Sequence, residues 1–163
     1  MRLSNKGAQF VAREEGMILH PYNDPAGYAT IGIGHLLHRS RVTLMDKIRW
    51  AGFRRSQAYK LLEADAERFA GPLRAHAASR HWNLNQAQFD ALTSFSFNVG
   101  TGWLKSSTLE RTLTDAARHG HRPSPAAVSK ALAMWSKAGG RTLTGLRQRR
   151  QREARLFNTG RYT

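Results

Sequence analysis

The sequence predicts an α+β protein that is mostly helical and has one short antiparallel sheet near its N-terminus. Two observations predict this class. Apolar residues recur with helical spacing over most of the chain after residue 56. Residues 17–37 lack that spacing and instead hold glycines and short β-favouring pieces such as 28–31. A chain of 163 residues suits one domain, built as two small lobes that share a core.

The first predicted element is a helix over residues 4–15. Ser4 or Asn5 can cap its start, and Gly16 stands where a glycine commonly ends a helix. Glu15 therefore falls in the last turn, next to a reversal of the chain. The glycine-bent sheet is expected directly after it.

Helices are predicted for most of the remaining chain. A short one covers residues 40–50, and a longer one begins at Ser56 and should end or kink at Gly71 and Pro72. No strand pattern returns after residue 40. Further helical patterns lie at residues 86–98, 107–118, 124–135 and 145–157.

These elements divide the predicted single domain, residues 1–163, into three parts. Residues 1–55 form a small α+β lobe, residues 56–80 form a connecting helix, and residues 81–163 form a helical lobe. We expect the N-terminal helix to pack on the helical lobe.

Composition excludes several classes of protein. The absence of cysteine excludes disulfides, thiolate metal sites and cysteine nucleophiles. No apolar run is long enough to span a bilayer, and the N-terminal residues have neither the apolar stretch nor the cleavage site of a signal peptide. We therefore expect a soluble protein with no export signal of its own.

The charge is strongly basic and unevenly distributed. The net charge is +15, yet residues 1–35 carry three basic and three acidic side chains, whereas residues 137–163 carry eight basic and one acidic. A solvated basic face, attraction to an anionic wall or membrane surface, and nucleic-acid binding all fit such a tail. Its only aromatic residues are Phe157 and Tyr162, which disfavours specific nucleic-acid recognition.

Two carboxylates and a hydroxyl are concentrated in the small lobe. Glu15 ends the predicted helix, Asp24 lies in the predicted hairpin, and Thr30 follows six residues later. Hydrolysis of a glycosidic bond needs one carboxylic acid for the leaving oxygen and a second carboxylate to attack or to activate water. The pair alone is not decisive, because Asp24 before Pro25 is also an ordinary turn signal.

The whole string of residues is more specific than the pair. Glu15 is followed by Gly16, Asp24 comes nine residues after Glu15, and residues 30–35 read Thr-Ile-Gly-Ile-Gly-His. In these positions the chain resembles the phage lysozyme family, glycoside hydrolase family 24, and most closely its lambdoid-phage branch. The resemblance extends to residues 94–102, 107–109 and 135–150, which look like the family's far side of the cleft and C-terminal block.

The resemblance implies a lysozyme-like fold and a role for each of the three residues. Glu15 would be the general acid, and Asp24 with Thr30 would hold and activate the attacking water, with inversion at the anomeric carbon. The acid must keep its proton until it is used, so the surroundings of Glu15 should be drier than those of Asp24. The neighbouring Glu14 is the rival acid, but it points roughly 100° away on the helix and better suits a surface charge.

The resemblance also implies supporting residues and glycan contacts. His35 would be structural and paired with Asp65, although a catalytic base is its competing role. Arg149 would be the cation beside Glu15. A metal site at His20, Asp24 and His35 is a remote alternative, since the spacing is not typical of metal ligands. Residues near family positions that contact the glycan are Leu36, Phe97, Ser107, Thr108 and Ser129.

The implied protein is a monomeric muramidase that needs no cofactor and acts on peptidoglycan glycan strands late in phage infection, causing lysis of the host. It would wait in the host cytoplasm until a separate membrane-permeabilising protein releases it to the wall. Three other functions stay open: a lytic transglycosylase acting on the same bond, a basic wall-binding or nucleic-acid-binding module without catalysis, and membrane damage by the arginine-rich C-terminal helix.

Overall fold

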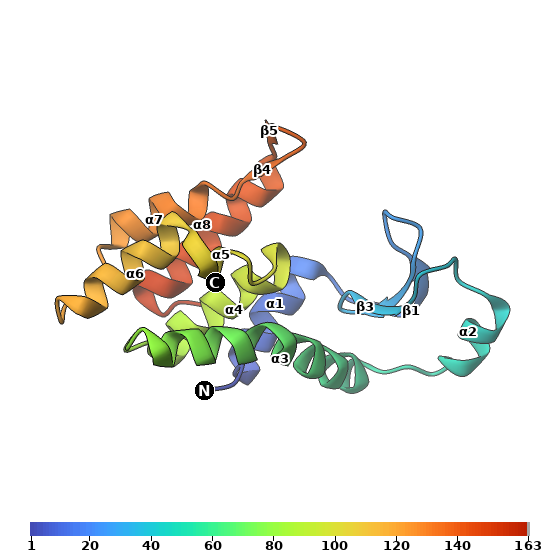
Figure 1. Cartoon of the computed structure of the whole chain (residues 1–163). Helices are drawn as coiled ribbons and strands as arrows, with labels where there is room; N and C mark the ends of the chain where they lie inside the picture. Colours follow the sequence, from blue (N-terminus) through green and yellow to red (C-terminus); the bar gives the residue numbers. More distant parts are fainter. Residues whose placement is uncertain (163) are drawn as a thin grey trace. The chain divides into compact units, whose positions relative to one another are not determined.

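The computed structural model describes residues 1–162 and confirms the α+β class, with many helices and one three-stranded antiparallel sheet (Figure 1). Two compact units are distinguished by their internal contacts. One comprises residues 8–67, and the other combines residues 1–7 with residues 68–163. No helix among the described residues is both long and apolar enough to cross a membrane.

The unit of residues 8–67 is built around the sheet. Its strands are β1 (Ile18–Asn23), β2 (Ala29–Gly32) and β3 (His35–His38), in the order β1-β2-β3. Before the sheet comes α1 (Asn5–Glu15), and after it come the short α2 (Leu44–Arg49) and the first part of α3 (Arg55–Ser79).

A small apolar core supports this sheet. Ile31 and Ile33 are buried together with Phe53, Ala58 and Leu62, which follow on the segment leading into α3 and on α3 itself. Gly32 lies between the two isoleucines with a φ of +68°, and a Cβ there would stand 3.4 Å from side-chain atoms of Phe53 and Ala58. The second residue of the Ile-Gly-Ile run is therefore a glycine both for its backbone conformation and for close packing.

The other unit is a group of helices around α4 (Gln86–Val99), in which residues 89–96 are all buried. Helix α4 packs against α8 (Thr144–Thr159), α8 against α7 (Pro125–Ala133), and α7 against α6 (Thr108–Arg118). The short α5 (Trp103–Ser106) precedes α6 and buries Trp103 and Leu104. A helix buried over most of its surface belongs in the middle of such a group.

Helix α3 runs from Arg55 to Ser79, close to the predicted connecting helix of residues 56–80. It does not end at Gly71 or Pro72, which was one of the two outcomes predicted there. The exposed Pro72 removes one backbone donor, while Ala70, Leu73 and Ala77 continue a buried stripe on both sides of it. Packing of that stripe outweighs the loss of one hydrogen bond.

The prediction that no strand follows residue 40 is wrong. Residues Lys137–Ala138 (β4) and Arg141–Thr142 (β5) pair antiparallel in a hairpin, which projects beyond the helices of its unit in Figure 1. The turn consists of Gly139 and Gly140, with φ values of +56° and +76°, as a two-residue turn between strands requires. Strands of two residues are too short to show a period of two in the sequence.

The boundaries of the other helices follow local capping. The predicted helix 40–50 forms only over α2, because the Thr43 side chain caps it and the Asp46 carboxylate accepts a hydrogen bond from the backbone N–H of Thr43. Asn85 and Gln88 form the same capping box at the start of α4. These caps fix where each helix begins.

The buried Asp90 connects the two ends of the described chain. Its carboxylate accepts hydrogen bonds from the backbone N–H of Ser4 at 3.0 Å, from the Ser4 hydroxyl, and from Nε2 of Gln86 at 2.9 Å. The hydroxyl of Tyr162 donates to Oδ2 of Asp90 at 2.7 Å. A single carboxylate on α4 thus holds residues near both termini.

Candidate active site

A hollow of about 700 Å³ opens on the unit of residues 8–67. It contains four of the residues that the sequence singled out: Glu15, Asp24, Thr30 and Leu36. The chain positions them from three different elements, the end of α1, the β1–β2 turn and the sheet. The other residues that line the hollow are Tyr22, Pro25, Tyr28, Gly34 and Arg39.

Glu15 is the last residue of α1, as the sequence predicted. The helix ends there because Gly16, with a φ of +79°, turns the chain while its N–H still bonds to the carbonyl of Ala12 at 3.0 Å. Glu15 is exposed and Asp24 is half-buried. In the protein without substrate, the expectation that Glu15 is drier than Asp24 is therefore wrong. Glu15 is the last residue of α1, and its side chain is exposed to solvent there.

Asp24 is fixed by the turn that joins β1 to β2. Its Oδ1 accepts hydrogen bonds from the backbone N–H of Ala26 at 2.9 Å and of Tyr28 at 2.8 Å. Its carbonyl accepts from Gly27 at 2.8 Å. The residue therefore has the turn-forming role that its place before Pro25 suggests, and this role holds the carboxylate in one orientation at the edge of the hollow.

The register of the sheet determines which side chains share the face with Thr30. Thr30 on β2 pairs with Tyr22 on β1 and with Leu36 on β3. Directly paired residues of antiparallel strands point to the same side of a sheet, so these three side chains form a row. Thr30 is only 3% exposed, and its hydroxyl donates to the carbonyl of Tyr28 at 3.1 Å.

Tyr22 is a site residue that sequence reasoning missed. Partial burial raises the pKa of its phenol, and the negative charges of Asp24 and Glu15 raise it further. The phenol is thus close enough to both carboxylates to feel their charge, and it stays neutral at ordinary pH. Its position opposite Thr30 could be found only with the strand register, which the sequence did not predict.

Arg39 is the second site residue that was missed. It is exposed and lines the hollow just after β3. The sequence offers no signal for it, because it is one of several arginines between residues 39 and 55.

The predicted pairing of His35 with Asp65 is present. Nδ1 of His35 lies 2.7 Å from Oδ2 of Asp65, which belongs to α3. This contact ties β3 to the helix that follows the sheet, as a structural residue would. Neither residue lines the hollow.

Four of the predicted glycan contacts belong to the other compact unit. Phe97 packs on Phe69 with ring centroids 5.3 Å apart. Ser107 caps α6 by accepting from the N–H of Glu110 at 3.0 Å. The backbone carbonyl of Thr108 accepts from the Thr112 hydroxyl at 2.8 Å.

The fourth of these residues, Ser129, donates to the carbonyl of Pro125 at 2.8 Å and accepts from Nδ2 of Asn158 at 3.1 Å. Each of the four has a local structural contact. Their contacts with glycan stay predictions.

Arg149 is buried within α8 and belongs to a charged cluster. Its Nε donates to Oε1 of Glu153 at 3.1 Å, and one terminal nitrogen donates to the carbonyl of Ser94 at 3.3 Å. Arg150 approaches the same carboxylate, with Nε 2.8 Å from Oε2 of Glu153. Burial raises the pKa of Glu153, while the charges of Arg150 and Arg149 act in the opposite direction. The predicted role of Arg149 beside Glu15 stays a prediction.

The alternative metal site is not formed. Among residues 1–162, no three His, Cys, Asp or Glu side chains come together in a group that could hold a metal ion. His20 lies on β1 but does not line the hollow that contains Asp24. The arrangement at the hollow instead provides two carboxylates and a buried hydroxyl.

The chain is similar to several known proteins. The model of the family described as phage lysozyme matches residues 12–153. The endolysin of Salmonella phage P22 is 31% identical over 96% of this chain and 98% of its own length. The structure of an endolysin from Escherichia coli O157:H7 phage FAHEc1 superimposes with a TM-score of 0.77 at 28% identity, covering 100% of this chain and 97% of the other.

Some relatives are longer than this chain. The endolysin of Bacillus phage B103 is 32% identical over 98% of the chain, which spans only 55% of that relative. The family match covers most of the chain, and it includes the segment with Glu15, Asp24 and Thr30. The chain therefore belongs to the phage lysozyme family.

Proposed function

We propose that this protein is a lysozyme that hydrolyses the β-1,4 bond between N-acetylmuramic acid and N-acetylglucosamine in peptidoglycan. The observation that carries the proposal is the hollow in which Glu15, Asp24 and Thr30 meet in a chain of the phage lysozyme family. Two carboxylates are the groups that cleavage of a glycosidic bond by water requires, and the hydroxyl of Thr30 adds an acceptor for that water.

Glu15 is the general acid in this proposal. When a glycan strand covers the hollow, it displaces water from the exposed Glu15, and this favours the protonated carboxyl. The proton then passes to the bridging oxygen as the bond to the anomeric carbon breaks. The drier environment that the acid needs is thus supplied by the substrate.

Thr30 and Asp24 position the water. Because the Thr30 hydroxyl donates its hydrogen to the carbonyl of Tyr28, its oxygen can only accept a hydrogen bond from water. Asp24 uses Oδ1 for the turn, and no described residue donates to Oδ2. A water that donates one hydrogen to Thr30 and the other to Oδ2 of Asp24 keeps a lone pair for the anomeric carbon.

This arrangement predicts inversion of configuration. Asp24 removes the proton of the water and does not itself bond to the sugar, so the water attacks from the face opposite the leaving oxygen. Leu36, 43% exposed beside Thr30, offers an apolar contact for a sugar ring. Phe97, Ser107, Thr108 and Ser129 are proposed as further glycan contacts.

The test is digestion of purified peptidoglycan by the wild type and by Glu15→Gln, with the product ends identified by mass spectrometry. Glu15→Gln is expected to lower the rate by about 100- to 10,000-fold, because an amide cannot donate the proton of an acid. Glu14→Gln is the matched control from the adjacent position and should keep the wild-type rate.

Asp24→Asn completes the test. It should also lose hydrolysis, and the wild type should release reducing ends. Full activity of Glu15→Gln would contradict the proposed acid. Anhydro sugar ends from the wild type would assign the chain to the lytic transglycosylases instead.

The bacterial cell wall is the proposed place of action, and the protein is proposed to act there as a monomer that lyses the host late in phage infection. Its relatives in Salmonella phage P22 and Bacillus phage B103 are endolysins. Release to the wall by a separate membrane-permeabilising protein belongs to the same proposal. Lysis of cells that express the chain, with and without such a partner, tests this route.

A further inference from the structure

Helix α2 carries three of the four most exposed large apolar side chains of the described residues. Leu44 is 73% exposed, Met45 69% and Ile48 60%. None of the six residues of this helix is buried. A helix usually forms because it buries an apolar stripe against the protein, so the apolar face of α2 has no such role in this unit.

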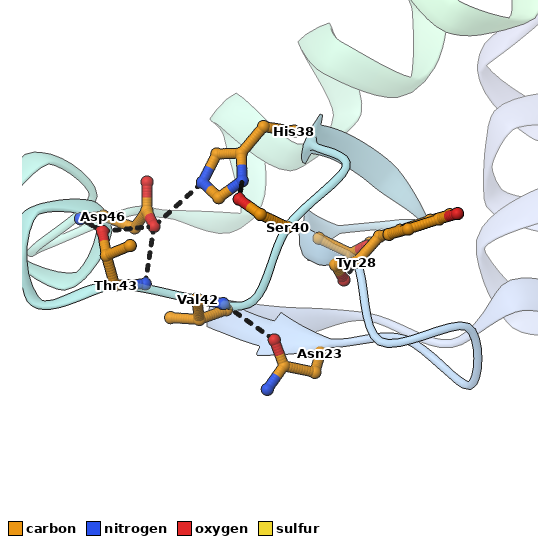
Figure 2. Close-up of polar contacts among 8 residues, drawn as sticks. Asn23, Tyr28, His38, Ser40, Val42, Thr43 and Asp46 are labelled. Carbon is orange, nitrogen blue, oxygen red and sulfur yellow. Dashed lines mark hydrogen bonds and ion pairs between the residues drawn. The ribbon is translucent and has the colours of Figure 1, made fainter.

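Polar contacts tie the start of α2 to the sheet, and Trp50 at its end packs on Phe53 with ring centroids 5.3 Å apart. Figure 2 shows Thr43 and Asp46 joined at the start of the helix, with the hydroxyl of Thr43 donating to Oδ2 of Asp46 at 2.7 Å. Nε2 of His38, on β3, lies 3.0 Å from the same carboxylate oxygen, and the N–H of Val42 donates to Oδ1 of Asn23 on β1 at 2.8 Å.

These bonds lower the pKa of Asp46 to about 2, with the hydrogen bond from the Thr43 side chain as the largest cause. The carboxylate of Asp46 is therefore charged across the ordinary pH range, and its Oδ2 is already in contact with Thr43 and His38. The side of α2 that bears Asp46 is the side held to the sheet.

The remaining side of α2 is amphipathic. Successive residues of a helix lie about 100° apart, so Leu44, Ile48 and Met45 occupy an arc of about 100°. Lys47 lies about 60° from one edge of this arc, and Arg49 about 40° from the other. An apolar arc bordered by cations on both sides is typical of helices that lie in the surface of a bilayer.

The charge around α2 also suits an anionic bilayer surface. Residues 39–55 contain Asp46 as their single acidic side chain, and Asp46 is already paired. The basic side chains of this segment are all exposed: Arg39, Arg41, Lys47, Arg49, Arg54 and Arg55.

We propose that the face of α2 formed by Leu44, Met45 and Ile48 docks on the surface of an anionic lipid bilayer. The apolar side chains enter the boundary between headgroups and acyl chains, and Lys47 and Arg49 contact lipid phosphates. A second copy of the chain is the less suitable occupant, because it would bring the same cations against one another and three side chains bury too little area for a stable dimer. The docking does not depend on the catalytic group.

The test is co-sedimentation of the full chain with vesicles at low salt. One set contains equal parts of phosphatidylglycerol and phosphatidylcholine, and the other contains phosphatidylcholine alone. The wild type should bind the anionic vesicles only. The triple variant Leu44→Ser, Met45→Ser, Ile48→Ser keeps every charge, and its affinity for the anionic vesicles should fall by about tenfold or more. Lys47→Gln with Arg49→Gln should weaken binding by about 30-fold.

The matched control is the double variant Met134→Ser, Leu143→Ser. These two residues are 61% and 45% exposed outside the unit that contains α2, so the variant should bind like the wild type. Circular dichroism and thermal unfolding establish that each variant is folded, which the exposure of the substituted residues favours.

Three results would overturn the proposal. The wild type fails to bind the anionic vesicles, or the triple variant binds them as well as the wild type, in which case net charge alone explains the binding. The third is a concentration-dependent dimer in sedimentation velocity that the triple variant loses, which would make a second copy the occupant of the face.

Discussion

At the scale of single residues, the site combines groups that serve the fold and the proposed chemistry together. Asp24 holds the β1–β2 turn through one carboxylate oxygen, and this fixes the direction of the other. The hydroxyl of Thr30 donates its single hydrogen to the carbonyl of Tyr28, and a water can therefore bind to this hydroxyl only as a donor. Local hydrogen bonds therefore orient the groups before substrate arrives.

Thr30→Val should lower kcat by about 100-fold or more with a smaller change in KM. Valine has nearly the same shape and preserves the packing of a residue that is 3% exposed, but it cannot accept a hydrogen bond from water. Thr30→Ser keeps the hydroxyl and should retain most of the activity. Steady-state kinetics on purified peptidoglycan separate the two effects. Equal rates for the serine and valine variants would exclude the hydroxyl from the reaction.

At the scale of elements, the helices show what sequence reasoning can predict. The predicted helices of residues 86–98 and 107–118 are present, and they begin where Asn85 and Ser107 cap α4 and α6. Local rules for Gly71 and Pro72 predict an end or a kink, whereas α3 continues through Pro72 because Leu73 and its neighbours are buried. The β4–β5 hairpin was not predicted because strands of two residues are too short to show an alternating pattern in the sequence.

The site residues also differ in whether the sequence predicts them. Glu15, Asp24 and Thr30 follow from the spacing of a motif and lie together at one hollow. Tyr22 and Arg39 became visible only with the strand register and the lining of that hollow, since neither stands in the motif. Local sequence encodes turns and caps, whereas cross-strand neighbours depend on pairing that a single strand does not reveal.

Ser107→Ala should reduce the free energy of unfolding by about 1 kcal/mol, because it removes the hydroxyl that accepts from the N–H of Glu110 at the start of α6. Ser107→Asp supplies another cap and should keep the stability of the wild type. Urea unfolding measures this.

The same pair of variants tests the predicted glycan contact of Ser107. If the hydroxyl also binds the glycan, Ser107→Asp raises KM although it preserves stability. An unchanged KM in both variants would leave Ser107 with the capping role alone.

At the scale of the whole molecule, the formal charge of +15 overstates the basic surface of the C-terminal helix. Arg149 and Arg150 are 6% and 1% exposed and lie against the fully buried Glu153. These two cations are therefore not available to a membrane or a wall polymer. The six basic side chains of residues 39–55 are all exposed by comparison, and this favours α2 over α8 as a lipid contact.

Tyr162→Phe should destabilise the protein by about 1 kcal/mol near neutral pH, since it removes the hydrogen bond to Asp90. Burial and the hydrogen bond to Asp90 raise the pKa of Tyr162 from 10.0 to about 12. A raised pKa in the folded state gives stability that is complete below pH 10 and is lost as the pH rises to about 12.

Unfolding by urea at a series of alkaline pH values checks this prediction. The wild type should lose its advantage over Tyr162→Phe across that interval, and the difference should be constant below it. A difference that does not change with alkaline pH would show that Asp90 holds the C-terminal end by other contacts.

The register that places Tyr22, Thr30 and Leu36 in one row also limits how the chain can vary in length. Side chains alternate between the two sides of a strand, so inserting or deleting one residue within β1 or β2 would turn Thr30 away from its neighbours even if the sheet still formed. Natural insertions and deletions should therefore be rare between residues 18 and 38 and more frequent at the projecting turn of Gly139 and Gly140, where no side chain of the hollow depends on the count.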